Sequence, residues 1–245
     1  MKKVLACFVL IAAAANCRAD VILGSASDFG VLAGTTITNA GNSAVYGEIG
    51  VNPGTAVVGF PPGIAVGGIH LNDMAAARAE ADLASACLYL SGLAPTANLT
   101  DLNLGGSTLT SGVYRFDAAA DLNGALTLSG SGIFLFQIAT SLNVANDSLI
   151  VTSGGANAAE IYFLTGSSVT TGASAALQGN FIAMQSISFG TGSSLTGRAL
   201  AIEGAVTMLD NAITIPAAAP EPGTLGLVAL IAALGYAGRR TKPLG

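Results

Sequence analysis

The carboxylates are the residues of this sequence whose type and spacing come nearest to a catalytic arrangement. Asp117 and Asp121 lie four positions apart, Arg115 is close by, and Asp101 precedes them. Two carboxylates with a basic residue in reach could serve as general acid and base in the cleavage of a polysaccharide. The same residues also fit solvated turns beside strands. We favour this second interpretation, and we expect no catalytic residues and no enzyme.

Metal-ligating and nucleophilic residues form no recognisable group either. His70, the single histidine, precedes an expected helix, where a structural hydrogen bond is more typical than a base or a ligand. Glu48 and Asp210 have no partner nearby in the sequence, and a lone acidic residue is normally solvated. Cys87 is the only cysteine outside the N-terminal segment. We therefore expect no metal, no cofactor and no intrachain disulfide.

Small hydroxyl residues and glycines repeat instead. The stretch SFGTGSSLTG (188–197) follows TTGASAALQG (170–179) at a constant offset, so that Gly190 is in step with Gly172 and Leu195 with Leu177. Neither stretch contains a charged residue, a histidine or a cysteine. The repeat therefore calls for an architectural explanation before a chemical one.

The N-terminus reads as a targeting segment rather than as part of the fold. Residues 1–19 combine two lysines, a long apolar run and small residues ending at Ala19, which is typical of a secretory signal peptide. A lipoprotein signal with Cys17 as the lipidated residue is the alternative, but Asn16 is a poor residue before such a cysteine. We expect cleavage after Ala19 and export of the rest.

The C-terminus carries a second targeting pattern. Residues 217–245 contain Pro-Glu-Pro at 220–222, an apolar segment at about 223–237 and two arginines at 239–240. The apolar segment is short for a membrane span, which needs about 17–25 residues; a short buried helix is the alternative. This order resembles a PEP-CTERM sorting tail. The resemblance implies a Gram-negative bacterium that makes extracellular polysaccharide, processing by an exosortase, and membrane contact only through this segment.

The region between the two ends is strongly acidic. Residues 20–219 carry three arginines and 13 carboxylates, a formal charge of −10. Lysine and arginine supply most of the affinity for nucleic acid, so we exclude nucleic acid as a partner. Anionic lipid is disfavoured for the same reason.

One segment has the periodicity of a helix. The predicted helix spans about residues 73–91. Asn72 or Asp73 is the N-cap candidate, and Ser91-Gly92 is the stop signal. At 1.5 Å per residue this helix would be about 28 Å long. The stripe that we expect to face a flat surface consists of Ala77, Ala81, Ala84 and Leu88.

The rest of the chain reads as short strands. Five apolar clusters recur at similar intervals along the chain: 112–116, 132–136, 160–164, 180–184 and 198–202. Between them lie strands in which apolar and hydroxyl residues alternate. The expected inward residues are Leu109, Leu126, Leu128, Leu149, Val151, Val169, Ile187, Phe189, Val206 and Met208.

A short sequence period with glycine corners, here about 18 to 20 residues, predicts a β-solenoid. About six coils, stacked about 4.8 Å apart, would form a column of about 29 Å, which matches the expected helix length. A β-sandwich also fits short strands at this spacing. The regular register between 169–184 and 187–202 favours the solenoid.

Three features in order carry a resemblance to a known family: the N-terminal stretch LGSASDFGVLAGTTITNAGNSAVYGEIGVNPG, GGIHLND before an alanine-rich helix, and the final LTGRALAIEGAVTMLDNAITI. Together, over residues 22–215, they resemble the bacterial and fungal ice-binding proteins. The resemblance implies a discontinuous right-handed β-helix with one long α-helix along a face, in which N-terminal coils and final strands combine. We place this domain at residues 20–216.

The resemblance also implies candidate ice-binding residues. Family members often carry a T-(A or G)-x-(T or N) pattern; this chain has Thr-Gly-x-Ser at 171–174 and 191–194, which we expect to stack one period apart, with another at 165–168. Serine at the last position lacks the threonine methyl, which lowers the expected strength of ice binding. A strand ladder competes with these motifs: Thr110, Thr127, Thr152, Thr170, Ser188 and Thr207. The candidates are thus Thr171, Ser174, Thr191, Ser194, Thr152, Thr170, Ser188 and Thr207.

Two functions are therefore weighed for an exported or cell-surface protein. The first is adsorption to ice and its ordered water through a flat Thr/Ser-rich face, because a rigid grid of hydroxyls can bind many water positions at once. The alternative is a non-catalytic protein of the cell surface or biofilm matrix, with extracellular polysaccharide as its partner. A flat, regular hydroxyl face would favour ice, and a cleft with converging charges would favour an enzyme.

Overall fold

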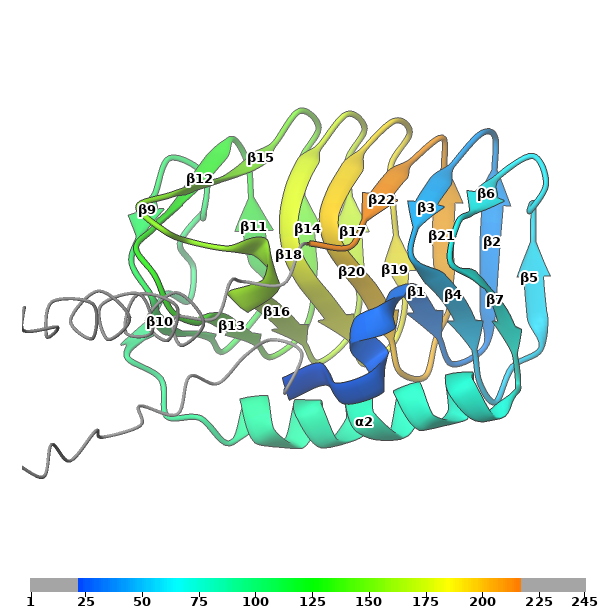
Figure 1. The fold of residues 1–245 in the computed structure, drawn as a ribbon. Helices are drawn as coiled ribbons and strands as arrows, with labels where there is room; N and C mark the ends of the chain where they lie inside the picture. The colour runs from blue at the N-terminus through cyan, green and yellow to red at the C-terminus, as the bar shows by residue number, and fades with distance from the viewer. Residues whose placement is uncertain (1–21, 217–245) are drawn as a thin grey trace, which may run out of the picture.

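The protein is a column of stacked parallel strands with one long helix along its side (Figure 1). The computed structural model describes residues 22–216. The expected signal peptide (1–19) and sorting tail (217–245) lie outside these residues. Among residues 22–216, no helix combines the length and the apolar character needed to cross a membrane.

One wall of the column is a seven-stranded parallel sheet. It has one strand more than the six coils expected, because two N-terminal strands add to the five from the repeat region. In spatial order its strands are β11 (Ala120–Leu122), β14 (Leu142–Val144), β17 (Val169–Thr171), β19 (Ile187–Ser188), β21 (Val206–Leu209), β2 (Thr36–Ala40) and β5 (Ala56–Val58).

A 15-stranded sheet forms the other two walls. Its longest strands, β18 (Ala176–Ala183) and β20 (Ser194–Ala201), take part in both. The helix-side wall adds β8 (Ala97–Asn98), β10 (Gly112–Phe116), β13 (Phe134–Ile138), β16 (Ile161–Thr165), β1 (Phe29–Ala33), β4 (Glu48–Val51) and β7 (Gly68–Leu71). The third wall adds β9 (Thr108–Leu109), β12 (Ala125–Ser129), β15 (Leu149–Ser153), β22 (Ala212–Thr214), β3 (Ala44–Tyr46) and β6 (Ile64–Ala65).

The order of coils along the column differs from their order along the chain. The first described coil, β1 to β3, pairs on one side with β20 to β22, the last coil. On its other side lies the second coil, β4 to β6, and β7 pairs with β4 at this end of the column. The helix α2 (Met74–Ser91) then returns the chain to the opposite end, where β8 and β9 begin the repeat region (Figure 1). The column is therefore discontinuous, as the family resemblance implies.

The five apolar clusters predicted from the sequence lie on the helix-side wall, in β10, β13, β16, β18 and β20. In β13, β16, β18 and β20 the side chains of these clusters are mostly buried on both faces, which explains why the clusters are continuous apolar runs; in β10, Arg115 is exposed. On the inner face, Tyr114, Phe136, Phe163 and Phe181 stack from coil to coil, with ring centroids 5.4, 4.5 and 4.8 Å apart. Each fully buried phenylalanine contributes about 1.5–3 kcal/mol.

The outer face of the same wall packs against α2 and the short helix η1 (Gly24–Asp28). As predicted, α2 begins after Asp73, whose carboxylate accepts a hydrogen bond from the Ala76 amide. The predicted buried stripe is wrong: Leu88 is 78% exposed, and Ala77, Ala81 and Ala84 are exposed as well. The stripe that packs on the wall is Ala76, Ala79, Leu83, Ala86 and Leu90.

One predicted strand register is also wrong. In β15, Ile150 is buried, whereas Val151, expected inside, is 39% exposed and Leu149 only half-buried. Every residue from Leu149 to Val151 is apolar, so alternation alone does not distinguish the two faces. The other predicted inward residues point into the column, with Leu109 half-buried at its end.

The glycines repeated in the sequence lie where coils stack most tightly. A Cβ atom on Gly190 would overlap the backbone carbon of Gly172, and one on Gly197 would overlap the carbonyl oxygen of Gly179. The glycine repeat is therefore a packing requirement of the corners. A further short helix, η2 (Ala158–Glu160), precedes β16.

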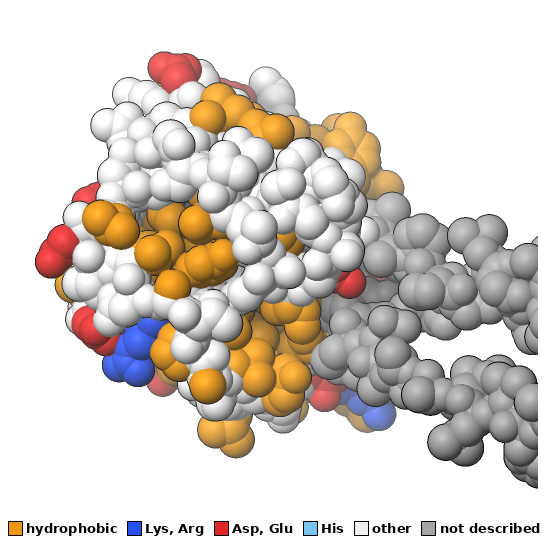
Figure 2. All heavy atoms as spheres, turned by 90° about the vertical axis from the view of Figure 1, so that its left-hand side faces the viewer, with side chains coloured by type: hydrophobic (Ala, Val, Ile, Leu, Met, Phe, Trp, Pro, Cys, Tyr) orange, Lys and Arg blue, Asp and Glu red, His pale blue; other side chains and the backbone are white. Residues whose placement is uncertain are grey.

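The end of the column at β8 and β9 leaves apolar side chains open to solvent. Figure 2 looks onto this end and shows hydrophobic atoms between polar ones. Leu102 is 57% exposed, while Leu99 and Leu109 pack partly against the core. Among residues 22–216, this end is thus covered by short loops and edge strands.

Candidate functional site

The outer face of the seven-stranded sheet presents one residue of each strand in a single line. Backbone pairing places these residues directly opposite one another on adjacent strands. In order along the column they are Asp121, Asn143, Thr170, Ser188, Thr207, Thr38 and Val58. We call the four central residues, Thr170, Ser188, Thr207 and Thr38, the hydroxyl ladder.

The hydroxyl ladder is open to water and rigidly supported. Thr170, Thr207 and Thr38 are exposed, and Ser188 is partly exposed. In residues 22–216, none of the four hydroxyl groups has a hydrogen-bond partner within the protein. Directly beneath them, Val169, Ile187, Val206 and Ile37 are at most 1% exposed and anchor the strands. Neighbouring rungs lie about 4.8 Å apart, the spacing of paired strands.

Chemically different residues continue the line at both ends. Beyond Thr170, the Asn143 side-chain amide donates a hydrogen bond of 3.1 Å to the Asp121 carboxylate. Beyond Thr38, Val58 is 57% exposed and has no polar atom in its side chain. The uncharged part of the line with free hydroxyls is therefore the four-rung ladder.

Hydroxyls beside the ladder serve the backbone instead. The Ser168 hydroxyl accepts a hydrogen bond from the Ser186 amide, and the Ser186 hydroxyl accepts one from the Ala205 amide. These bonds link successive coils at the corner that precedes each ladder strand. They help to fix the spacing of the rungs.

The two Thr-Gly-x-Ser motifs do not form a stacked array. Their separation along the chain is larger than the offset at which β18 and β20 pair, so Ser194 lies opposite Ala176 rather than Ser174. Thr171 is 4% exposed, and its hydroxyl accepts a hydrogen bond from the Gly190 amide. Thr191 and Ser174 are exposed at the corner, and Ser194 is exposed on the third wall. In the third motif, Thr165 is fully buried.

The predicted six-residue strand ladder divides between two walls. Thr170, Ser188 and Thr207 belong to the hydroxyl ladder. Thr127 and Thr152 lie on β12 and β15 of the third wall, and Thr110 follows β9 of that wall. Thr152 is half-buried and donates a hydrogen bond of 3.1 Å to the Gln178 side chain.

The sequence analysis did not identify Thr38, the fourth rung. The signal that could have found it is the alternation in TITNA (36–40), in which Ile37 and Asn39 are buried while Thr38 and Ala40 are exposed. The partner strand of Thr38 is β21, which lies near the opposite end of the described chain, and no local pattern indicates that pairing.

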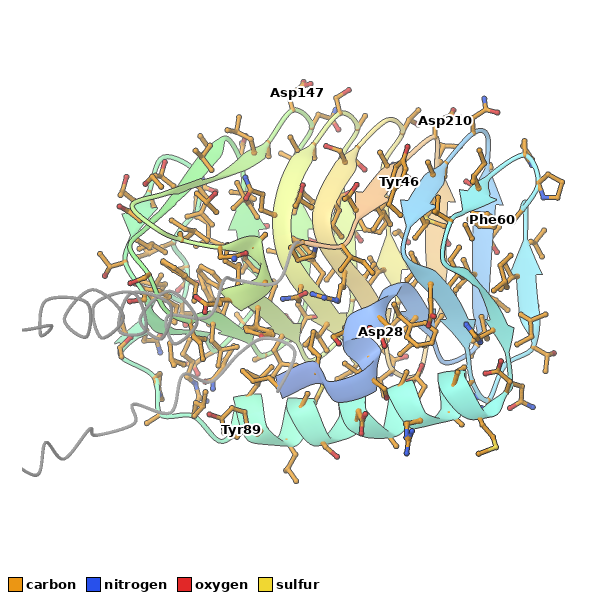
Figure 3. All side chains as sticks on the ribbon, in the orientation of Figure 1. Asp28, Tyr46, Phe60, Tyr89, Asp147 and Asp210 are labelled. Atoms are coloured by element: carbon orange, nitrogen blue, oxygen red, sulfur yellow. The ribbon has the colours of Figure 1, made fainter. Side chains whose placement is uncertain are left out.

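The outer face of the third wall mixes apolar and hydroxyl side chains: exposed Thr196 lies opposite exposed Thr214, and Thr108 lies opposite Thr127. One line of opposed residues is Ala125, Leu149, Ala176, Ser194, Ala212, Ala44 and Ile64. Ile64 is 60% exposed, and Tyr46, labelled in Figure 3, is 54% exposed. Side chains of such different size do not present a regular array of hydroxyls.

The carboxylates weighed for catalysis belong to different structural elements. Asp117 accepts hydrogen bonds from Arg115, at 2.6 Å, and from Asn98. The Arg115 guanidinium and then the Asn98 amide lower the pKa of this carboxyl, which suits a structural ion pair and not a general acid. Asp121 belongs to the seven-stranded sheet, and Asp101 occupies a turn with positive φ. No group of three or more metal-ligating side chains occurs among residues 22–216.

His70 has structural partners on three sides. Its Nδ1 atom lies 2.8 Å from the carboxylate of Asp73, the N-cap of α2, and its Nε2 atom lies 3.6 Å from Glu48. Its ring packs edge-on against Phe29, with centroids 5.5 Å apart. His70 therefore joins β7, β4 and β1 to the start of α2.

An apolar cavity of about 430 Å³ lies beside the C-terminal half of α2. Cys87, Leu88, Phe116, Ile138 and Met184 contribute to its lining. Burial, and then the nearby Glu80, raise the pKa of the Cys87 thiol to about 12, so this cysteine is an unreactive thiol at neutral pH.

Sequence comparison matches this chain to ice-binding proteins. The sequence model of a family described as ice-binding-like matches residues 31–214. An ice-binding protein of Nostoc sp. is 46% identical over 151 residues, which are 60% of this chain and 56% of that protein. One from Flavobacterium frigoris is 31% identical over 165 residues, 61% of this chain and 60% of that protein. The chain thus matches less than two thirds of the length of these curated relatives.

Solved structures agree with the sequence comparison. An ice-binding protein from an Antarctic biological consortium superposes with a TM-score of 0.77 at 39% identity, covering 79% of this chain and 90% of that one. One from the Antarctic ascomycete Antarctomyces psychrotrophicus gives a TM-score of 0.76 at 38% identity, covering 79% and 97%. The fold of residues 22–216 is therefore shared over nearly the whole of these two neighbours.

Proposed function

Because this chain belongs to the ice-binding-like family, we propose that it binds ice through the outer face of the seven-stranded sheet. The observation that carries the proposal is the hydroxyl ladder. Its four side chains lie in register on four adjacent strands, and their hydroxyls are free to hold water. The relatives that are named ice-binding proteins support the same activity.

The ladder suits ice because it combines regular spacing with rigidity. Each threonine offers a hydroxyl that can hold an ordered water and a methyl that limits competing water orientations. The β-branched side chain has few rotamers, and the strand beneath it is anchored in the core, so little entropy is lost on binding. Many weak contacts made at the same time then produce a lasting attachment.

The composition of the ladder indicates moderate activity. Only four rungs carry free hydroxyls, and Ser188 lacks the methyl of the other three. Asp121 places a charged group at one end of the line. We therefore infer that inhibition of ice recrystallisation is the main activity and that thermal hysteresis is small.

The experiment compares two tyrosine substitutions in the full-length chain. Thr207→Tyr places a bulky ring in the middle of the ladder, and Thr196→Tyr places the same ring on an exposed position of the third wall. We expect Thr207→Tyr to lower thermal hysteresis and recrystallisation inhibition about tenfold, while Thr196→Tyr stays within about twofold of wild type, because a protruding ring breaks many contacts at once.

Each other outcome has a definite meaning. Loss of activity with Thr196→Tyr alone would move the site to the third wall. A folded wild-type protein without activity would refute ice binding. It would leave the alternative, a non-catalytic cell-surface or biofilm-matrix protein that contacts extracellular polysaccharide.

We further propose that the described column is a right-handed β-helix exported by the signal peptide at residues 1–19. In this proposal the tail at 217–245 is a PEP-CTERM signal, processed by an exosortase in a Gram-negative host, so that the domain at 20–216 is secreted or retained at the cell surface. Mass spectrometry of the protein recovered from such a host tests this. A mature chain that still begins at Met1 and ends at Gly245 would contradict it.

A further inference from the structure

The hydroxyl ladder crosses a seam between two distant parts of the chain. Thr170, Ser188 and Thr207 come from the repeat region, whereas Thr38 comes from the first described coil. The seam lies between β21 and β2, which pair from Ile37 opposite Val206 to Ala40 opposite Leu209. No continuous coil holds Thr207 next to Thr38, so strand pairing and the hydrogen bonds at the seam set their register.

Asn211 lies at this seam and is 2% exposed. It follows Asp210, which Figure 3 shows at the turn between β21 and β22. Its side-chain amide donates hydrogen bonds to the Gly190 carbonyl at 2.8 Å and to the Ser193 hydroxyl at 2.9 Å. Gly190 lies just after Ser188 in the chain, so these bonds hold the coil that carries the Ser188 rung.

The Asn211 side chain also binds its own coil, whereas its backbone binds the coil across the seam. Its side-chain oxygen accepts a hydrogen bond from the amide of Leu209, which lies just after Thr207. Its backbone N–H donates to the Ser43 hydroxyl at 2.9 Å, and its carbonyl accepts from the Ala44 amide at 2.8 Å. One buried residue therefore connects the coils of three consecutive rungs: Ser188, Thr207 and Thr38.

Equivalent positions in other coils show that this role belongs to the seam. Strand pairing places Ser148, Ala175, Ser193, Asn211 and Ser43 in one line, each just before a strand of the third wall. All five are buried. Ala175 has no polar side-chain atom, so a coil between continuous neighbours needs none at this position. The asparagine, with the most hydrogen-bonding groups, lies where the chain is discontinuous.

We propose that Asn211 is a positioning residue for ice binding: its side chain fixes the backbone segment whose N–H and C=O bond to Ser43 and Ala44, and this keeps the two halves of the hydroxyl ladder in register across the seam. The proposal rests on the function proposed above. Register matters because a slip of one residue in a strand turns its outward side chains inward, and a smaller shift spoils the match to a crystal lattice. Asn211 itself does not touch ice, since it is buried beneath the corner.

The test compares Asn211→Ala with Ser148→Ala in the full-length chain. Ser148 occupies the same line, is fully buried, and bonds through its hydroxyl to Leu122 and Gly124, away from the ladder. Both variants are measured near 0 °C, where circular dichroism reports whether they are folded. We expect Asn211→Ala to lower thermal hysteresis at least about fivefold and Ser148→Ala to stay within about twofold, although both lose buried hydrogen bonds.

Two further readouts separate positioning from general stability. Nuclear Overhauser contacts between the Thr38 and Thr207 methyls should weaken in Asn211→Ala and persist in Ser148→Ala. In a Thr38→Ala background, where the ladder already ends at the seam, Asn211→Ala should cause a much smaller loss than in wild type. If Asn211→Ala does not fold, Asn211→Asp replaces it, because aspartate keeps the acceptor for Leu209 and loses the donors to Gly190 and Ser193.

The results that overturn the proposal are specific. A folded Asn211 variant with activity within about twofold of wild type, or with unchanged Thr38–Thr207 contacts, would refute it. An inactive wild type would refute the proposed function instead. In that case the methyl contacts alone decide the positioning role: their loss in the Asn211 variant only would sustain it, and their persistence would refute it.

Discussion

Ser188 is the rung of the hydroxyl ladder at which a single methyl group is missing. It lies between Thr170 and Thr207, and both neighbours carry the methyl. Ser188→Thr should therefore extend the uniform part of the ladder without disturbing the core, because Ile187 and Phe189 hold the strand beneath it. A β-branched residue is also well suited to a strand. We expect about a twofold gain in thermal hysteresis at equal protein concentration.

The matched control for this prediction is Ser153→Thr, which adds the same methyl to an exposed position of β15 on the third wall. An equal gain in both variants would show that the methyl acts through general stability or solubility. It would contradict the prediction that a methyl on the hydroxyl ladder acts through contact with ice. Freezing-point measurements on the two variants and wild type distinguish these cases.

Glu80 is a residue whose protonation should affect stability. Burial raises the pKa of this carboxyl to about 8 from an ordinary value of 4.5, and its Oε1 atom has no hydrogen-bond partner among the described residues. Between these two pH values the unfolded chain releases its proton while the folded protein keeps it, so stability falls as pH rises and levels off above about 8. The nearby Cys87 titrates near pH 12, outside this window.

Replacing Glu80 removes the carboxyl group that makes stability decrease as pH rises. We expect Glu80→Gln to match wild type at pH 4 and to be more stable by roughly 1–3 kcal/mol at pH 9, since each unit of pKa shift corresponds to about 1.4 kcal/mol before solvent screening is allowed for. Denaturant unfolding at intervals from pH 4 to pH 9 measures the effect. Parallel pH profiles for the two proteins would show that Glu80 is ionised and solvated in the folded state.

At the scale of elements, α2 shows what the sequence can and cannot predict. Its N-cap, Asp73, is one of the two candidates predicted from the sequence, and its length was predicted from local chemistry. The buried face of α2 was not predicted correctly, because alanines lie on both possible stripes and the two stripes differ little in hydrophobicity. The distinction depends on two leucines, Leu83 and Leu90, which outweigh the single Leu88 on the other stripe.

A pair of leucine substitutions tests this assignment of the buried face. Leu83→Ala should lower the free energy of unfolding by about 2–4 kcal/mol, because it leaves a cavity between α2 and the helix-side wall. Leu88→Ala should change it by no more than about 0.5 kcal/mol, since Leu88 is 78% exposed. Thermal or denaturant unfolding measures both, and comparable losses would mean that the opposite face of the helix also packs.

The inward-facing side chains of some strands could be predicted from the sequence, and those of other strands could not. Val169, Ile187 and Val206 alternate with hydroxyl residues, so their inward direction could be predicted. In β15 three successive apolar residues do not reveal which side chains point inward, and the predicted register is wrong by one residue. The two Thr-Gly-x-Ser motifs have the same residue types, but their separation along the chain differs from the offset at which β18 and β20 pair, so the motifs do not stack. Three of the four ladder rungs were among the predicted candidates, and Thr38 was absent because its pairing with β21 is non-local.

At the scale of the whole molecule, the period of the sequence predicts a column but not the order of its coils. The repeat region stacks in chain order, so its sequence period reveals it. The first described coil contacts the last one, and only the long-range pairs β1·β20, β2·β21 and β3·β22 define that arrangement. The helix α2 makes it possible, because it carries the chain along the column from one end to the other.

This arrangement implies that residues 22–94 and 95–216 would remain associated without a covalent link. The two parts meet along three strand pairs and through the apolar cluster that includes Leu23, Leu83, Leu135 and Leu200. The connection after α2, at Ala94 and Pro95, is exposed. A specific protease site inserted there should be cut without separating the fragments, because the backbone pairing and the buried apolar area at the seam are unaffected.

The measurement is gel filtration of the cleaved protein, followed by a thermal hysteresis assay. We expect one peak that contains both fragments and activity within about twofold of the uncut protein, since all four rungs stay in place. The uncut protein with the same insertion is the control. Separation of the fragments under native conditions would mean that the seam is held together mainly by the chain connection, and the hydrogen bonds that Asn211 makes across the seam would then be too weak to set the register of the ladder.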